Sequence, residues 1–202
     1  MNTRFHTLAP SGEATDHDYG SIYFREPCGD SERLVIGASK KPIALLDKLS
    51  GCFSSEVTYA LYVLLVSRLG HPSGRYQSPL LDTHEDLQVF LYTFQEYFES
   101  DGRHHLWIGA PDGSAMLVFD QHDVIFAYGD LDAFERVLID EGYTPKDFWF
   151  PAPHGHSYNP ENDKYEDEIM SHFDWVQTDL QDGDEWDQSN KPTENKSQQT
   201  NR

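Results

Sequence analysis

The sequence predicts an α+β fold, in which a small antiparallel β-meander packs with amphipathic helices and an irregular C-terminal extension follows. Three short apolar runs at 105–109, 115–120 and 123–129, separated by turn-forming residues, predict the meander. The helices are predicted where apolar residues recur at the spacing of one helical face, most regularly at 83–100. At 202 residues, the chain is long enough for one domain with a substantial core.

The N-terminal part of the chain has weaker sequence patterns for secondary structure. Residues 1–18 are polar and broken by proline and glycine, so we expect an irregular arm there. Two β-prone runs at 21–26 and 33–39, separated by the turn-like sequence PCGDS, predict a hairpin. A short helix is expected to begin at Pro42 and end at Gly51, because proline favours the first helical turn and glycine the residue after the last.

Two longer helices are expected next. The segment EVTYALYVLLVSRLG at 56–70 is apolar on nearly every side, which predicts a helix buried at the centre of the domain and stopped at Gly70. The helix at 83–100 begins with a capping-box variant, because Thr83 is followed three residues later by Asp86. Its apolar stripe consists of Leu87, Phe90, Leu91, Phe94 and Phe98.

The predicted meander has turns with a clear physical basis. The Asp-Gly pair of PDGS at 111–114 supports positive φ in the first turn, and the Gln-His pair at 121–122 spaces the second as a two-residue hairpin. Asp130 is expected to cap a helix that ends at Gly142. These elements together predict a core domain over 19–142.

Beyond the core domain the composition changes. We expect 143–186 to form a proline-rich and aromatic, then acidic, extension that packs on the core, with the aromatic run at 148–150 covering it. A short helix is expected at 161–173, and an edge strand or extended arm at 174–186. The polar low-complexity tail at 187–202 is expected to be disordered.

The overall charge limits the class of partner. The formal net charge is −20, from 35 acidic residues against 15 basic ones. This composition argues against direct nucleic-acid binding and against adsorption to an anionic membrane, and it favours association with a basic protein. No targeting segment and no apolar run of membrane-spanning length is found, and Cys28 and Cys52 are expected to be free thiols. We therefore expect a cytoplasmic protein.

The sequence contains no strong catalytic signature. It has no phosphate-binding glycine-rich loop, no G-x-S-x-G and no H-E-x-x-H, so we assign no catalytic residue, no metal ligand set and no cofactor. An alternative that stays open is a metal-assisted hydrolase using His154 and His156, because imidazoles two residues apart on a strand point the same way. A third ligand would have to come from His172, Asp163 or His122, and their spacing does not select one.

The acidity is concentrated in one segment. Residues 158–187 carry 11 acidic residues and one lysine, together with tryptophan, tyrosine and phenylalanine. We interpret this segment as an ordered negative surface that steers a basic protein into place; the alternative is a solvated acidic edge with buried aromatics. The predicted partner-binding residues are Asp163, Glu166, Asp167, Glu168, Asp174, Trp175, Asp182, Asp184, Glu185 and Trp186.

One unit of the chain resembles a known group of proteins. The sequence LWIGAPDGSAMLVFDQHDVIFAYGDLDAFERVLIDEGY at 106–143 is a meander with short turns that runs into one capped helix. With the acidity, this unit resembles the small acidic α+β immunity proteins of bacterial polymorphic toxin systems, of the Rhs or contact-dependent inhibition type. The resemblance covers about a fifth of the chain and transfers no binding residue.

The resemblance implies a cytoplasmic, non-enzymatic protein that binds one cognate toxin and occludes its active site. The expected partner is a basic protein such as a toxin nuclease domain, whose substrate channel is positive. A DNA-mimic inhibitor of a nucleic-acid-binding protein is a further alternative, since it would use the same negative charge.

Overall fold

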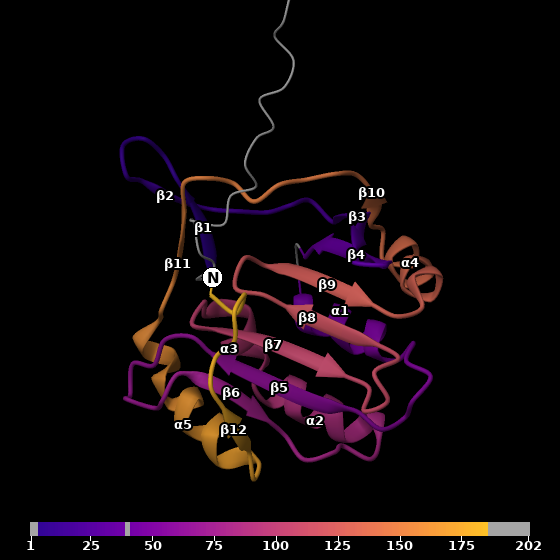
Figure 1. Ribbon diagram of the computed structural model, residues 1–202. Helices are drawn as coiled ribbons and strands as arrows, with labels where there is room; N and C mark the ends of the chain where they lie inside the picture. Colours follow the sequence, from indigo (N-terminus) through magenta and orange to yellow (C-terminus); the bar gives the residue numbers. More distant parts are fainter. Residues whose placement is uncertain (1–3, 39–40, 186–202) are drawn as a thin grey trace, which may run out of the picture.

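The structure, a computed structural model, describes residues 4–38 and 41–185. Its largest element is a nine-stranded sheet with the strand order β10-β3-β4-β9-β8-β7-β5-β6-β12 (Figure 1). Its strands are β3 (Ile22–Cys28), β4 (Ser31–Gly37), β5 (Tyr59–Leu64), β6 (Gly74–Gln77), β7 (His104–Gly109), β8 (Met116–Phe119), β9 (Val124–Tyr128), β10 (Thr144–Pro145) and β12 (Val176–Thr178). The sheet is antiparallel apart from the β10–β3 pair, and the predicted α+β class is confirmed.

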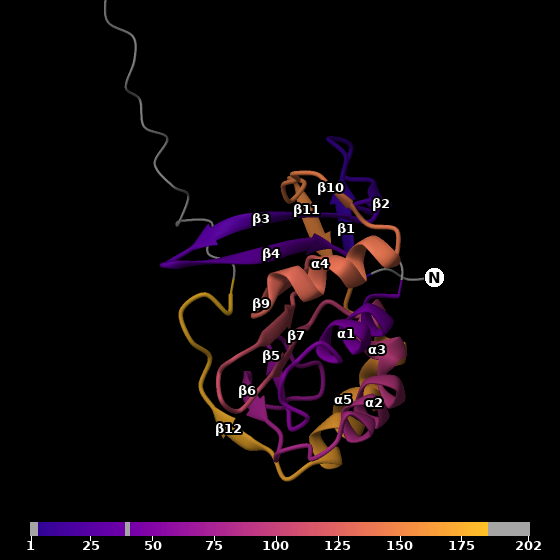
Figure 2. The ribbon, with the colours of Figure 1, turned by 90° about the vertical axis from the view of Figure 1, so that its right-hand side faces the viewer.

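The two faces of this sheet are covered by different parts of the chain (Figure 2). The helices are α1 (Pro42–Ser50), α2 (His84–Thr93), α3 (Gln95–Ser100), α4 (Leu131–Asp140) and α5 (Asp163–His172), which follows a 3-10 turn at Pro160–Asn162. Figure 2 shows α1 to α4 against one face, whereas the C-terminal segment crosses the opposite, open face. None of the described helices is long and apolar enough to cross a membrane.

Most of the predicted local elements are confirmed. The hairpin is β3–β4, the short helix is α1 with Gly51 after it, and the meander is β7–β8–β9. Thr83 and Asp86 form the expected capping box, and Asp130 caps α4 by accepting a hydrogen bond from the Ala133 N–H. The helix expected at 83–100 is split at Phe94 into α2 and α3.

The predicted central helix at 56–70 is wrong, because this segment contains β5, an interior strand of the sheet. Its side chains alternate between two apolar layers, with Ala60, Tyr62 and Leu64 beneath the helices, and Leu61, Val63 and Leu65 on the open face. A strand that is buried on both faces shows no alternation of polar and apolar residues. Periodicity alone therefore cannot distinguish such a run from a buried helix.

The expected irregular N-terminal arm is also wrong over most of its length. The strands β1 (Phe5–Leu8) and β2 (Ala14–Asp16) form a hairpin, and β1 also pairs with β11 (His154–His156) in a second, three-stranded sheet. Phe5 is fully buried between this small sheet and the large one. The strand that orders β1 lies about 150 residues away in sequence, so no local pattern reveals it.

The extension at 143–185 is attached to the core at several places. The strand β10 pairs with β3, β11 pairs with β1, and β12 pairs with β6 as the expected edge strand. Of the aromatic run at 148–150, Phe148 and Phe150 pack on the core, but Trp149 is 86% exposed and does not. The tail expected to be disordered, 187–202, lies outside the described residues.

Gly102, just before β7, lies in close contact with the small sheet. A Cβ atom there would lie 2.8 Å from the Arg4 carbonyl oxygen and 2.9 Å from the His156 Cβ. We expect Gly102→Ala to lower the free energy of unfolding by about 1–3 kcal/mol, because the backbone of β1 must shift. Urea denaturation measures this, with Gly51→Ala as control, since a Cβ at Gly51 meets nothing closer than 3.4 Å. Equal losses in the two variants would contradict the close approach.

Candidate partner-binding surface and histidine cluster

The acidic extension is fastened to the core by a buried arginine. Arg103, just before β7, is fully buried and donates hydrogen bonds to Asp101 Oδ1 (2.8 Å), Glu166 Oε2 (2.6 Å) and Asp163 Oδ1 (3.1 Å). A buried charge is stable only when it is paired and hydrogen-bonded. The two acids of α5 therefore serve as anchors that hold this helix against the sheet.

A second arginine fastens the end of the described chain. Arg75 donates to both carboxylate oxygens of Asp184, at 2.7 Å each, and its guanidinium lies 4.8 Å from the ring centroid of Trp107. The Asp184 carbonyl oxygen is 2.8 Å from His105 Nε2. These contacts hold residues 181–185 against the open face of the sheet.

These ion pairs correct the predicted set of partner-binding residues, because they bury two of its members. Glu166 and Asp184 are 0% and 3% exposed, so neither can contact a partner, and Asp163 is partly buried between Arg103 and Arg68. The predicted site residues that remain exposed are Asp167, Glu168, Asp174, Asp182 and Glu185. Trp175 is half-buried and donates to the Ile169 carbonyl oxygen (2.7 Å), and Trp186 lies outside the described residues.

Asp174, which follows α5, lies in one of two neighbouring hollows in the surface. One, of about 410 Å³, is lined by Tyr76, Met170, Phe173, Asp174, Trp175 and Gln177. The other, of about 360 Å³, is lined by Pro79, Leu80, Leu81, Asp82, Asp86, Val89, His172 and Phe173. Because Phe173 lines both, the hollows are neighbours, and we call their combined lining the Phe173 surface.

The Phe173 surface combines exposed apolar side chains with carboxylates. Leu80 and Val89 are each 56% exposed, whereas the Phe173 ring packs on the Phe90 ring with their centroids 5.2 Å apart. Its carboxylates are Asp82, Asp86 and Asp174. Among the described residues, no lysine or arginine lines either hollow. Burial lowers the pKa of His172, so this imidazole is neutral at physiological pH.

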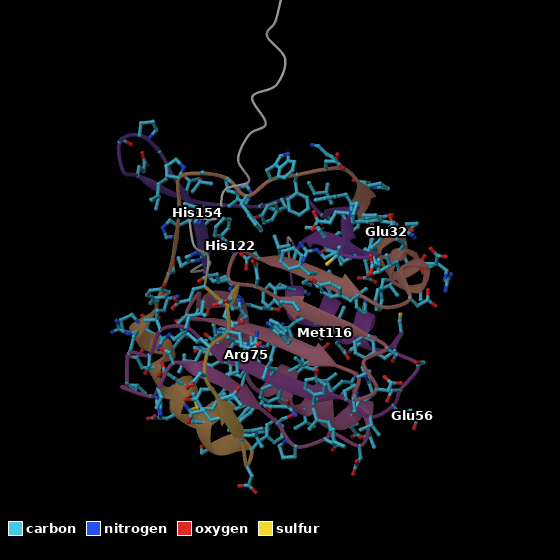
Figure 3. The ribbon with its side chains drawn as sticks, viewed as in Figure 1. Glu32, Glu56, Arg75, Met116, His122 and His154 are labelled. Atoms are coloured by element: carbon cyan, nitrogen blue, oxygen red, sulfur yellow. The ribbon has the colours of Figure 1, made fainter. Side chains whose placement is uncertain are left out.

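A larger pocket, of about 630 Å³, lies on the open face of the sheet. Figure 3 shows Arg75 and Met116, which both line it, on the face turned to the viewer. Its walls combine aromatic rings with paired cations: the Arg33 guanidinium lies 4.3 Å from the Phe126 ring centroid and forms an ion pair with Glu26. The end of the pocket is lined by Asp120, Gln121, His122 and Phe150.

Beside this end of the pocket, three histidines converge. His122 comes from the turn between β8 and β9, and His154 and His156 come from β11. One ring nitrogen of each lies within 4.8 Å of those of the other two, and the ring centroids are 5.0–5.6 Å apart. Figure 3 shows His122 and His154 together where the small sheet meets the large one.

Hydrogen bonds fix the orientation of these rings. His154 Nδ1 is 2.7 Å from the Pro151 carbonyl oxygen, and His156 Nδ1 is 3.1 Å from that of Gln121. His122 Nδ1 is 2.7 Å from Asp120 Oδ2. Burial, with the nearby charges of His122 and Arg4, lowers the pKa of His156 to about 3, so its imidazole is neutral at physiological pH.

Of the three third ligands considered from sequence, the structure brings only His122 to the pair on β11. Asp163 is engaged with Arg68 and Arg103, and the His172 ring packs against Phe94 with centroids 5.1 Å apart. The Phe173 surface and the large pocket had no sequence signal of their own, because each combines segments that are far apart in the chain.

No protein-family model, no curated protein and no solved structure matches the chain. The resemblance to immunity proteins therefore stays a prediction.

Proposed function

We propose that the protein is a non-enzymatic binding protein of the immunity or inhibitor type, and that it binds a basic protein at the Phe173 surface. The observation that carries this proposal is the pair of adjoining hollows in which exposed aliphatic side chains lie beside carboxylates. Among the described residues, neither hollow is lined by a lysine or an arginine. Exposed aliphatic side chains beside hollows suit the dry centre of an interface. A rim of one charge suits a partner of the opposite charge.

The two kinds of group have different roles in binding. Apolar side chains of the partner fill the hollows beside Phe173 and lose their contact with water, which provides most of the affinity. The carboxylates, together with the net charge of −20, accelerate the encounter with a basic partner and fix its orientation. A specific interface buries about 800 Å² on each partner, so it extends beyond the hollows to the exposed acids of α5.

A toxin nuclease domain is the partner class that best fits this chemistry. Its substrate channel is positive because it binds phosphates. Carboxylates held over that channel take the place of the phosphates and keep substrate out. Neutralisation then results from occlusion and needs no catalytic residue on this chain.

Co-expression tests the proposal. The proposal predicts that a toxin-like protein is encoded beside this gene. Cells that produce that toxin-like protein are expected to survive when the wild-type protein is co-expressed. They are expected to die when it carries Leu80→Arg and Val89→Arg, two exposed positions on the Phe173 surface. The double variant has to be present at wild-type levels. Full protection by that variant, or no protection by the wild type, would overturn the proposal.

Charge reversal on α5 and beside it is expected to slow association. Replacing Glu168 and Asp174 with lysine should lower the association rate with the partner by about 10-fold at low salt, and by less at high salt, because salt screens exposed charges. Stopped-flow or surface-binding kinetics measure this. The control is Asp140→Lys with Asp147→Lys, which changes the net charge equally at exposed positions elsewhere. Equal slowing in both variants would indicate a general charge effect and no localised surface.

A further inference from the structure

We propose that His122, His154 and His156 form a binding site for one divalent transition-metal ion, with zinc as the best match, and that this ion has an exchangeable coordination position next to the large pocket. The site is separate from the Phe173 surface. It does not depend on the proposed partner, and the two proposals fail or succeed independently.

The pairing of strands β1 and β11 brings the three imidazoles together. His154 and His156 are two residues apart on β11, so their side chains leave the strand on the same side. Pairing of β11 with β1, in the register Phe5↔His156, places this side against the β8–β9 turn that carries His122. The ligand nitrogens all lie within 4.8 Å of one another.

The hydrogen bonds of the rings match those of metal-binding histidines. A carbonyl oxygen only accepts hydrogen bonds, so Nδ1 of His154 and Nδ1 of His156 carry the protons in these contacts. With Nδ1 as the hydrogen-bond donor, Nε2 of each of these two rings is the nitrogen left to coordinate a metal. His122 faces the Asp120 carboxylate through Nδ1 in the same manner. Metal-binding histidines in proteins almost always donate their other N–H to a carbonyl or a carboxylate.

Aromatic rings pack against all three imidazoles of the cluster. The buried Phe5 ring lies 5.3 Å from the ring of His154, 5.7 Å from that of His156 and 5.5 Å from that of His122, measured between centroids. Phe150 stacks on His122 at 4.7 Å. These rings limit the access of water and restrict the rotation of the imidazoles, so little side-chain entropy is lost when an ion binds.

The donor set selects the kind of ion. Neutral imidazole suits zinc, copper, nickel and iron, whereas magnesium and calcium require oxygen ligands. Nitrogens about 2.0–2.1 Å from a tetrahedral zinc lie about 3.3 Å apart. The nitrogens here lie within 4.8 Å of one another. Side-chain rotations that move each nitrogen by about 1 Å therefore bring them to zinc-binding distance without a change of fold.

Three imidazoles leave one position of a tetrahedral ion for another donor. His122 belongs to the cluster and also lines the pocket of about 630 Å³, so an ion bound to it lies next to that pocket. The fourth donor is then water or an anionic or nitrogen donor of a small molecule held in the pocket. Such three-histidine sites with an exchangeable position are the arrangement that zinc proteins use to bind ligands.

Metal titration of the untagged, chelator-treated protein tests the site. We expect isothermal titration with Zn²⁺ to give one equivalent with a Kd tighter than about 1 µM. Zn²⁺ at 100 times the Kd should raise Tm by about 5–10 °C. The variants His154→Gln and His156→Gln should each weaken binding by at least about 100-fold.

The matched control is His6→Gln. His6 lies on β1 opposite Gly155, in the same small sheet, and is not part of the cluster, so its replacement should leave Zn²⁺ affinity unchanged. Circular dichroism and the Tm without metal verify that each variant folds. Absence of a bound equivalent, or wild-type affinity in the His154 and His156 variants, would overturn the site.

Cobalt tests the exchangeable position separately. The visible spectrum of the Co²⁺-loaded protein should change when azide or imidazole is added, because such donors enter the open position. A Co²⁺ spectrum that no added donor alters would contradict the exchangeable position, although a closed structural ion would then still be bound.

Discussion

Arg103→Met is expected to lower the free energy of unfolding by about 3–5 kcal/mol and to release α5 from the core. The guanidinium of Arg103 is fully buried and forms ion pairs with both Asp101 and Glu166, which are themselves 0% exposed. Methionine fills much of the same volume but leaves both carboxylates buried without a counter-charge. The loss of this compensation makes the expected effect large.

Urea denaturation measures the loss, and hydrogen exchange in α5 measures the release of the helix. The control is Arg68→Met, because Arg68 pairs with the same helix through Asp163 but has a side chain 39% exposed. Exposed ion pairs contribute less than about 1 kcal/mol, so this variant should be close to wild type. Similar losses for Arg68 and Arg103 would contradict the role of the buried network.

Leu80→Arg combined with Val89→Arg is expected to weaken binding of the basic partner by at least about 100-fold, or about 2.7 kcal/mol. Both side chains line the same hollow and are each 56% exposed. The substitutions remove apolar contact and place positive charge opposite a positive partner. Because the side chains are exposed, the free energy of unfolding should change by less than about 0.5 kcal/mol for each.

Ile139→Arg is the matched control for this surface. Ile139 is 60% exposed on α4, and its replacement is the same kind of change at a site outside both hollows. Calorimetry or surface-binding kinetics with the purified partner should give wild-type affinity for this variant. An equal loss for Ile139→Arg would show that positive charge anywhere on the protein weakens binding.

Local sequence patterns predicted the elements whose signals are local. The meander, the capping box of α2 and the capped helix α4 each depend on residues close together in the chain. The sequence of β5 resembles that of a buried helix because both faces of the strand are buried, which removes the period of two that marks a strand. The sequence of β1 and β2 has no local strand pattern, because β1 is ordered by pairing with β11.

The candidate sites were less predictable, for a related reason. Counting acids along 158–187 located an acidic segment but could not show that Arg75 and Arg103 bury two of its carboxylates. For the histidines, the spacing of His154 and His156 indicated a shared direction. The contact between β11 and the β8–β9 turn, which adds His122, exists only in the folded chain.

Hydrogen exchange of the protein with and without its purified partner tests the central claim most directly. Binding at the Phe173 surface should slow exchange at 79–92 and at 170–178, the segments that contain most of the lining of both hollows. Exchange around the large pocket, at 113–128 and 181–185, should be unchanged. Protection confined to the pocket segments, with none at the Phe173 surface, would contradict the account.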